Sequence, residues 1–402
     1  MSSYADLLRT PGVARIIGAQ LTARFPNGML SLAYLLHVEG ITGSYGAAGL
    51  VLAATSVGQA VAGPLTSRWM GIWGMRRVLV LTLIVCAISM GAVALLVLPV
   101  WAYMLIGLVG GLATPPVQPA VRTIYPKMVN SRQLTPLFSL DASAQEIIWV
   151  AAPVVTTFIA TQVSTTTAIL VAMAFLVGGG SWFIASPEVG RVRIPRSRRS
   201  IGKVLARRPV LLATITGFLL VGACAAVEAS VVASFGEGSA DSGIVLAIWA
   251  IASLVGGLSF GHIPIGPWAL SRRMFVVFIG MTLAIFASGF WSLSAALLVA
   301  GITLAPALAV MFAIVSASVK FSETAEAYGW AGTGQLIGAA IGSAFAGFLI
   351  DANGPVGGFW VAAAFAGVGF IVPTVFVRWH PDLRERDASP SPDTEPVAVQ
   401  PS

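Results

Sequence analysis

The chain has 402 residues, of which 57% are hydrophobic and only 10% are charged. An average soluble domain carries about a quarter charged residues. Sixteen acids and 23 bases cannot cover the surface of a water-soluble protein of this length, so a soluble enzyme is excluded. The two cysteines, Cys86 and Cys224, lie in apolar runs and indicate no disulfide framework.

Runs of about twenty apolar residues recur along the whole chain, and a bilayer core of about 30 Å requires segments of this length. These runs are continuously apolar, which excludes an outer-membrane barrel with its period of two. The first twelve residues are polar and the first apolar run is too long for a signal peptide, so we expect no cleavable signal. We predict an all-α membrane protein with twelve transmembrane helices, near residues 13–37, 44–66, 77–98, 101–122, 139–161, 166–186, 209–234, 241–262, 272–292, 295–319, 326–350 and 356–378.

The placement of the basic residues predicts the topology. If both termini lie on one side, every one of the 23 Lys and Arg residues except Arg24 shares that side. The loops on the other side, such as 161–167 and 351–357, contain none. The positive-inside rule therefore places both termini in the cytoplasm. Because the bases report topology, they give no support for nucleic-acid binding.

The same pattern divides the chain into four parts. We expect an N-terminal six-helix half at residues 1–186, a cytoplasmic basic linker at 187–208, a C-terminal six-helix half at 209–380 and a disordered cytoplasmic tail at 381–402. The linker holds eight bases and one acid. It is either a solvated connection or a segment that also binds anionic lipid.

The two halves contain matching features. Val57-Gly58 and Gly63 in the second span correspond to Val255-Gly256 and Gly261 in the eighth, at an offset of 198 residues. The pair Arg76-Arg77 likewise corresponds to Arg272-Arg273, at an offset of 196. Two six-helix halves in parallel repeat are typical of alternating-access transporters.

The loop after the second span reads Gly63-Pro-Leu-Thr-Ser-Arg68-Trp-Met-Gly71-Ile-Trp-Gly74-Met-Arg76-Arg77 and resembles the loop signature of the major facilitator superfamily. Ser67 stands where that family usually has Asp, so a gating ion pair that needs this Asp is not expected. The stretches 24–29, 43–46 and 119–122 are similar to actinobacterial members of the family. The resemblance implies a secondary transporter of the bacterial cytoplasmic membrane, whose two halves rock around a site at the membrane midplane.

Arg24 is the one base inside a span. A central Arg costs about 2.5–3.5 kcal/mol on insertion scales, so it should face a wet cavity or a partner instead of lipid. A polar stripe at helical spacing includes it, and Pro26 should bend the helix beside it. The stripe is either a substrate- or anion-binding face or a structural hydrogen-bond network, and it consists of Gln20, Arg24, Asn27, Ser31 and Tyr34.

Glu228 is the only acid deep inside the C-terminal half. A carboxyl group in apolar surroundings favours its neutral form and can exchange a proton near neutral pH. Glu228 is therefore our candidate proton carrier. A static pair with Arg24 is the alternative, although the repeat offset places Glu228 about 9 Å further out.

Asp141 and Glu146 lie at the cytoplasmic start of the fifth span, on the same side as Arg122 and Arg68. An Arg122–Glu146 or Arg68–Asp141 pair would hold the cytoplasmic face shut and break when it opens. Ordinary interfacial acids at a helix N-terminus are the alternative. The candidate cytoplasmic gate comprises Arg68, Arg76, Arg77, Arg122, Asp141 and Glu146.

Further polar and aromatic side chains are candidates for the cavity lining: Gln59, Gln118, Trp149, Trp249 and Gln335. In contrast, the glycines that recur every four residues from Gly334 to Gly342 indicate close helix packing. Hydrolase and Walker motifs are absent, and the three histidines are scattered, so we expect neither an enzyme nor a metal or other cofactor.

These patterns predict a secondary transporter, most simply a monomer in the bilayer, that couples proton movement to efflux of a drug-like compound or metabolite. A cavity with one Arg and one Glu suits amphipathic molecules better than sugars. Proton-coupled import of a small anionic nutrient is one alternative. A membrane sensor or scaffold that transports nothing is another.

Overall fold

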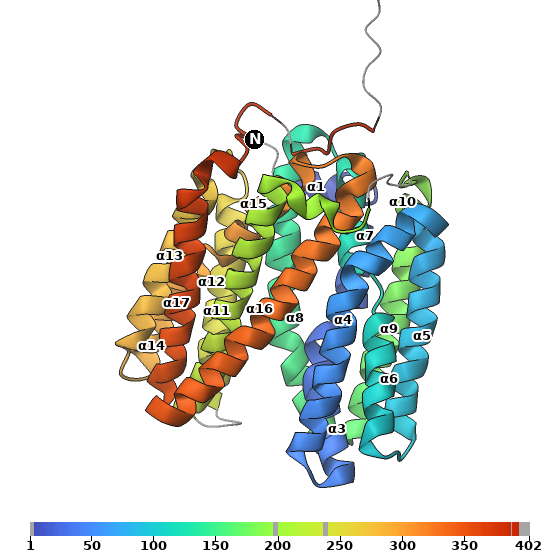
Figure 1. Ribbon diagram of the computed structural model, residues 1–402, viewed down its shortest axis with the longest axis vertical. Helices are drawn as coiled ribbons and strands as arrows, with labels where there is room; N and C mark the ends of the chain where they lie inside the picture. Colours follow the sequence, from blue (N-terminus) through green and yellow to red (C-terminus); the bar gives the residue numbers. More distant parts are fainter. Residues whose placement is uncertain (1–3, 196–199, 236–239, 387, 394–402) are drawn as a thin grey trace, which may run out of the picture.

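The computed structural model describes residues 4–195, 200–235, 240–386 and 388–393 (Figure 1). Within these residues all the regular secondary structure is helical, and the only β pairing is a single bridge between Lys320 and Ser391. The all-α fold predicted from the sequence is therefore confirmed.

The helices fall into two groups joined by a short connection. The N-terminal half contains α1 (Tyr4–Arg9), α2 (Val13–Arg24), α3 (Pro26–Thr42), α4 (Tyr45–Trp73), α5 (Met75–Leu95), α6 (Val100–Leu112), α7 (Val117–Met128), α8 (Ser131–Gln162) and α9 (Thr165–Ala185). The connection includes α10 (Pro187–Arg191) and the 3-10 turn η1 (Lys203–Ala206). The C-terminal half contains α11 (Arg208–Phe235), α12 (Ala240–Phe260), α13 (Ala269–Ile285), α14 (Phe290–Gly301), α15 (Leu304–Ala317), η2 (Phe321–Glu323), α16 (Thr324–Asn353), α17 (Pro355–Val375) and η3 (Val377–Trp379).

Ten stretches of the described chain are long and apolar enough to cross a membrane. The other two expected spans fall short for different reasons. The first is divided into α2 and α3 at Phe25, and α13 has only 17 residues. The count of twelve spans therefore stays a prediction.

Proline and its neighbours explain where spans break. Pro26 has no backbone N–H, so the helix that carries Arg24 ends there and restarts as α3. Pro115 and Pro116 separate α6 from α7 in the same way. In the C-terminal half, α14 and α15 separate at Ile302–Thr303, three residues before Pro306. The fourth span of each half is thus broken at a corresponding place.

The two halves converge at one end of the molecule and diverge toward the other (Figure 1). The converging end carries α1 and α10, and we call it the basic end because most of the described Lys and Arg residues lie in the loops and helix ends there. The halves meet through α8 against α12 and α15, and through α16 against α4 and α7. One hydrophobic core contains residues of both halves, including Phe138 and Phe312. A second core lies within the N-terminal half alone, around Met29 and Met90.

Glycines allow α16 to approach α11 closely. A β-carbon at Gly338 would overlap the carbonyl oxygen of Phe218, and one at Gly342 would overlap that of Gly222. Gly347, further along α16, has no atom within 4 Å of the corresponding position. The small-residue stripe thus packs two backbones together, in agreement with the packing interpretation of the sequence.

Gly338→Ala is expected to destabilise the protein by about 1–3 kcal/mol, because the new methyl group forces α16 away from α11. Gly347→Ala is the matched control. It should be neutral or slightly stabilising, because alanine favours a helix and the site has space. Thermal unfolding of the two purified variants measures the difference, and equal melting temperatures would contradict the close packing.

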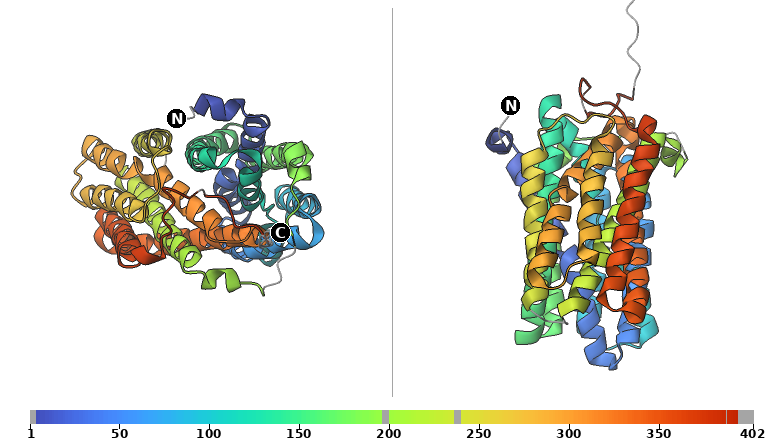
Figure 2. Two further views of the ribbon diagram at one scale, coloured as in Figure 1. Left: turned by 90° about the horizontal axis from the view of Figure 1, so that it is seen from above. Right: turned by 90° about the vertical axis from the view of Figure 1, so that its left-hand side faces the viewer.

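The C-terminal tail differs from the disordered segment expected from the sequence. Residues 381–386 and 388–393 lie against the loops of the C-terminal half at the basic end, and Figure 2 shows this segment running across that end. The backbone N–H of Leu383 donates to Ile265 O (2.9 Å), and Ser391 exchanges backbone hydrogen bonds with Val319 and Phe321. Ser322 Oγ donates to Asp393 Oδ1 (2.6 Å). These hydrogen bonds to two separate loops order a segment that is expected to be disordered from its composition alone. Residues 394–402 lie outside the described residues.

Candidate functional site

Asp141 on α8 is the centre of a buried polar network in the N-terminal half. Its Oδ2 accepts a hydrogen bond from Arg122 Nε (3.0 Å). Its Oδ1 accepts from Gln20 Nε2 (3.0 Å) and from the Tyr125 hydroxyl (3.2 Å), and it forms an ion pair with Arg24 Nη1 (3.6 Å). Asp141 is completely buried, so its charge is compensated only by these groups.

Arg24 reaches this network from the end of α2. Its Nη1 donates to Gln20 Oε1 (2.7 Å) and its Nη2 donates to Gln145 Oε1. The side chain is only 5% exposed, so most of the guanidinium is held by protein, as the structural interpretation of the polar stripe predicts. The Nε donor of Arg24, unlike its two Nη groups, is buried and has no hydrogen-bond partner among the described residues.

Arg122 on α7 connects the network to the other half. Its guanidinium carbon lies 3.3 Å from the ring centroid of Phe312 on α15 and 5.9 Å from that of Tyr328 on α16. The Gln118 amide lies against the same guanidinium and accepts from Nη2 (3.0 Å) when its oxygen faces the arginine. A desolvated cation–π contact is worth about 2 kcal/mol. The network therefore contributes to the contact between the halves.

The ion pairs differ from those expected. Arg122 pairs with Asp141 and not with Glu146, and Arg68 pairs with Glu326 of α16 and not with Asp141. Arg24 also pairs with Asp141 and not with Glu228. The reason is spatial, because α2, α7 and α8 meet around Asp141 within one half. Two guanidinium groups share one carboxylate, which leaves one excess positive charge in the cluster.

Glu146 is on the side of α8 that packs against the C-terminal half. Three residues on successive turns of α8 contact α12: Ser139 Oγ donates to Gly257 O (2.5 Å), Ser143 lies against Gly257, and Glu146 is hydrogen-bonded to Ser253. The Ser253 oxygen accepts from the backbone N–H of Ala305 (3.1 Å), which leaves its hydroxyl hydrogen for the Glu146 carboxyl. Glu146 therefore lies on the interface between the halves, further inward than Ser139.

Glu228 lies on α11 in the C-terminal half, one turn after Cys224. Its carboxyl group is near enough to Glu146 for the two charges to interact. Glu146 is 7% exposed, whereas Glu228 is exposed although α11 packs against α12, α15, α16 and α17. The Glu228 side chain is thus accessible although its helix is surrounded by other helices. Two carboxyl groups so arranged favour sharing a proton over being ionised together. No group of three or more His, Cys, Asp or Glu in the described chain is arranged to hold a metal ion.

The basic end is closed by contacts that involve residues absent from the sequence-based site. Arg68 Nη1 donates to Glu326 Oε2 (3.0 Å), and the other Glu326 oxygen accepts from the Gly202 backbone (2.8 Å). Glu323 accepts from Arg207 (2.6 Å). A search for acids on the same side as the basic loops would have found both glutamates. Ser67, in place of the signature Asp, is buried against Gly329 and its hydroxyl has no partner among the described residues.

Replacing Arg68 by Ala should raise the population that is open at the basic end by roughly 5-fold, because a partly exposed ion pair is worth about 1 kcal/mol. Spin labels at Trp73 and Arg378, two exposed positions of the two halves, measure the separation in a background with Cys86→Ser and Cys224→Ser. Arg132→Ala, at an exposed position of the same end, is the control. Identical distance distributions in both variants would show that the pair does not hold this end shut.

The other predicted side chains are dispersed. The helix break separates the polar stripe: Gln20 and Arg24 are buried in the network, Asn27 and Ser31 are exposed on α3, and Tyr34 is buried in the N-terminal core. Trp249 is 6% exposed and packs against Gly301 of α14, within the C-terminal half. Gln59 and Gln335 are half-buried, and Trp149 and Arg77 are exposed. Arg76 donates to Ser186 O (3.2 Å) in its own half.

Comparison with known proteins gives the same architecture. A family model described as Major Facilitator Superfamily matches residues 16–287 and 230–401. The fold is similar to a bacterial homologue of the iron transporter ferroportin in the outward-facing state, with TM-score 0.72, 12% identity, and coverage of 91% of this chain and 98% of that chain. It is also similar to the human organic anion transporter MFSD10 (TETRAN), with TM-score 0.69 and 16% identity. This match covers 90% of this chain and 100% of that chain. The transporter FucP in the outward conformation is similar as well, with TM-score 0.69 and 15% identity. The match covers 92% of this chain and 99% of that chain. No curated protein sequence matches.

The matched residues extend over nearly the whole chain, and the chain belongs to the major facilitator superfamily. Members of this family are multi-pass membrane transporters that move small molecules by alternating access. The two diverging halves that meet at the basic end are the arrangement on which this motion depends.

Proposed function

We propose that the chain is a proton-coupled secondary transporter that exports a small amphipathic organic molecule, a drug-like compound or a metabolite, from a bacterial cell. The observation that carries this proposal is the pair Glu146 and Glu228, one from each half: Glu146 lies on the interface between the halves, and Glu228 is near enough for the two charges to interact. A carboxyl pair at this place can respond to protons and to the movement of the halves together.

The proposed cycle starts from the state seen here. If the positive-inside rule applies, the basic end is cytoplasmic, and the chain is closed toward the cytoplasm and open outward. Glu228 then takes a proton from the outside. Conversion to the inward-open state separates α8 from α12, breaks the Glu146–Ser253 hydrogen bond and exposes the carboxyl pair to the cytoplasm, where the proton leaves. Each pH unit supplies about 1.4 kcal/mol per proton, and each 100 mV adds about 2.3 kcal/mol.

A second candidate function is import of a small anion. It is supported by the excess positive charge of the Asp141 network and by the unpartnered Nε of Arg24. A substrate carboxylate that displaced Gln145 would satisfy this donor. Gln20, Arg24, Gln118 and Gln145 would then bind the substrate, whereas Asn27 and Ser31 would line its path.

Transport by the purified protein in proteoliposomes tests both functions. We expect an imposed pH gradient to drive amphipathic ethidium against the direction of proton flow in the first case. In the second case the gradient drives carboxyfluorescein, an anion, together with protons. If neither dye nor a wider panel of organic ions responds to the gradient, the chain is not a proton-coupled carrier, and the non-transporting alternative is favoured.

A further inference from the structure

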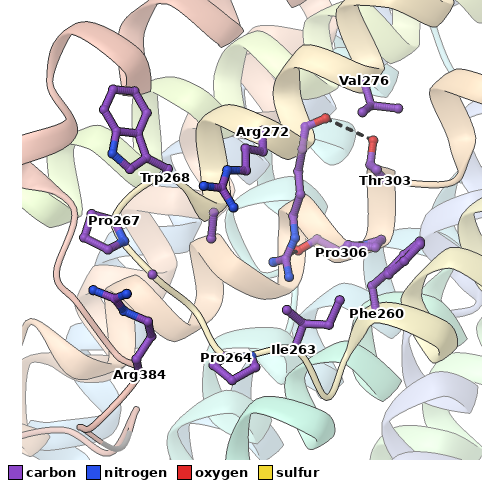
Figure 3. Close-up of a pocket in the computed structure, with 13 residues that line it drawn as sticks. Phe260, Ile263, Pro264, Pro267, Trp268, Arg272, Val276, Thr303, Pro306 and Arg384 are labelled. Carbon is purple, nitrogen blue, oxygen red and sulfur yellow. Dashed lines mark hydrogen bonds between the residues drawn. The ribbon is translucent and has the colours of Figure 1, made fainter.

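A cavity of about 520 Å³ lies at the basic end of the C-terminal half, outside the interface that carries the proposed transport site (Figure 3). One wall comes from the end of α12 and the loop after it, including Phe260, Ile263 and Trp268. Val276 of α13 and Pro306 of α15 extend this apolar wall. The cavity is therefore apolar over most of its lining.

Three arginines and no acids complete the lining. Arg384 forms a double hydrogen bond with Asp382, which lowers the pKa of the Asp382 carboxyl to about 2, so this pair is neutral at physiological pH. Arg273 donates to Pro306 O (3.0 Å), which fixes the side chain without neutralising its charge. Arg272 is exposed and forms no hydrogen bond or ion pair with the described residues. Two positive charges therefore remain uncompensated.

The start of α13 increases the preference for an anion. Arg272 and Arg273 are the fourth and fifth residues of this helix, and no side chain caps its N-terminus. The partial positive charge of a helix N-terminus favours an anion there. Together, the free guanidinium of Arg272 and the helix end suit a phosphate group.

The repeat equivalent of Arg272 in the N-terminal half has protein partners. Arg76, the repeat equivalent of Arg272, donates to Ser186 O and lies against Gly190 of α10. In the C-terminal half, the described segment after α17 contributes only Arg384 to the cavity lining. Arg272 thus lies beside an open, basic cavity without a partner among the described residues, whereas Arg76 is held by protein groups.

We propose that this cavity binds the phosphate headgroup of an anionic phospholipid, with the phosphate at Arg272 and Arg273 and the acyl chains along the apolar wall. A freely dissolved phosphate would satisfy the arginines but leave Phe260, Ile263 and Val276 against water. Trp268 is 47% exposed at the rim, where an indole ring suits the membrane–water interface. The bound lipid fills the cavity and supports the loop between α12 and α13.

Lipid binding by the full chain tests the proposal. The Arg272→Gln/Arg273→Gln variant should bind phosphatidylglycerol about 30-fold more weakly than the wild type in native mass spectrometry and in thermal-shift titrations. Phosphatidylcholine and inorganic phosphate are the two comparison ligands, and neither should raise the melting temperature of the wild type. Arg76→Gln/Arg77→Gln removes the same charge at the same end and should keep the wild-type affinity.

Three results would overturn the proposal. Equal losses in the two double variants would show general attraction to a basic surface, and equal stabilisation by inorganic phosphate would show a site for a free anion. Unchanged binding after Arg272→Gln/Arg273→Gln would place the lipid elsewhere. Arg272→Gln alone removes an exposed side chain without described partners, so a weaker affinity at an unchanged lipid-free melting temperature supports the site even if the double variant is unstable.

Discussion

Asp141→Asn should destabilise the protein by about 3–5 kcal/mol, the cost of leaving buried charges uncompensated. The carboxylate is completely buried and compensates two guanidinium groups, those of Arg24 and Arg122. Its replacement leaves both bases in the interior with only neutral partners. It also removes the acceptor that aligns Arg122 against Phe312, so the contact between the halves should weaken as well.

Thermal unfolding in detergent or nanodiscs measures this loss. Asp351→Asn, an exposed acid at the other end of α16, is the matched control and should change the free energy of unfolding by less than about 0.5 kcal/mol. Arg24→Gln should cost less than Asp141→Asn, because Asp141 keeps Arg122. The Arg24→Gln/Asp141→Asn double variant should be less unstable than the sum of the single losses. An Asp141→Asn variant as stable as the control would show that the network is not a structural element.

Glu228→Gln should reduce gradient-driven transport at least tenfold, because glutamine keeps the shape of the protonated side chain but cannot exchange a proton. Exchange of substrate across the membrane without a gradient should persist, since the halves can still move. If the two carboxyl groups act as a pair, Glu146→Gln should also lose gradient-driven transport and keep exchange without a gradient. Asp351→Asn again serves as the control, with full activity expected.

The two Glu variants also distinguish a coupling role from a structural one. A structural role predicts that driven transport and exchange fall together and that the melting temperature drops. Loss of driven transport alone, at an unchanged melting temperature, supports coupling. Full driven transport in both variants would exclude these carboxyl groups as the proton carriers.

The helices were predictable from the sequence because a bilayer allows few alternatives. Continuous apolar segments must form helices to satisfy their backbone groups, and their ends are marked by Arg, Pro and Gly. The break after Arg24 and the breaks before Pro115 and Pro306 follow from local chemistry, since proline removes a backbone donor. The family resemblance of the loop at residues 63–77 is likewise confirmed.

The partners of the buried charges were not predictable in this way. Arg24 and Asp141 are 117 positions apart, and which carboxylate meets which base depends on how α2, α7 and α8 are rotated against one another. Hydropathy does not specify this rotation. Glu146 looked like a gate residue because it follows Asp141 along α8, but it lies on the side of α8 that faces α12. The order of the C-terminal tail was not predictable, because hydrogen bonds to backbone groups distant in the sequence hold it in place. The residue pattern of the tail itself does not reveal these bonds.

The most direct test of the proposed mechanism measures protons and substrate together. Proteoliposomes that hold a pH-sensitive dye are given an ethidium gradient at equal pH on both sides, and lumenal pH is followed as ethidium moves. The account predicts that wild-type protein moves protons opposite to ethidium and that Glu228→Gln abolishes the pH change while slower ethidium exchange continues. Ethidium movement by the wild type with no change in lumenal pH would contradict proton coupling at the Glu146–Glu228 pair.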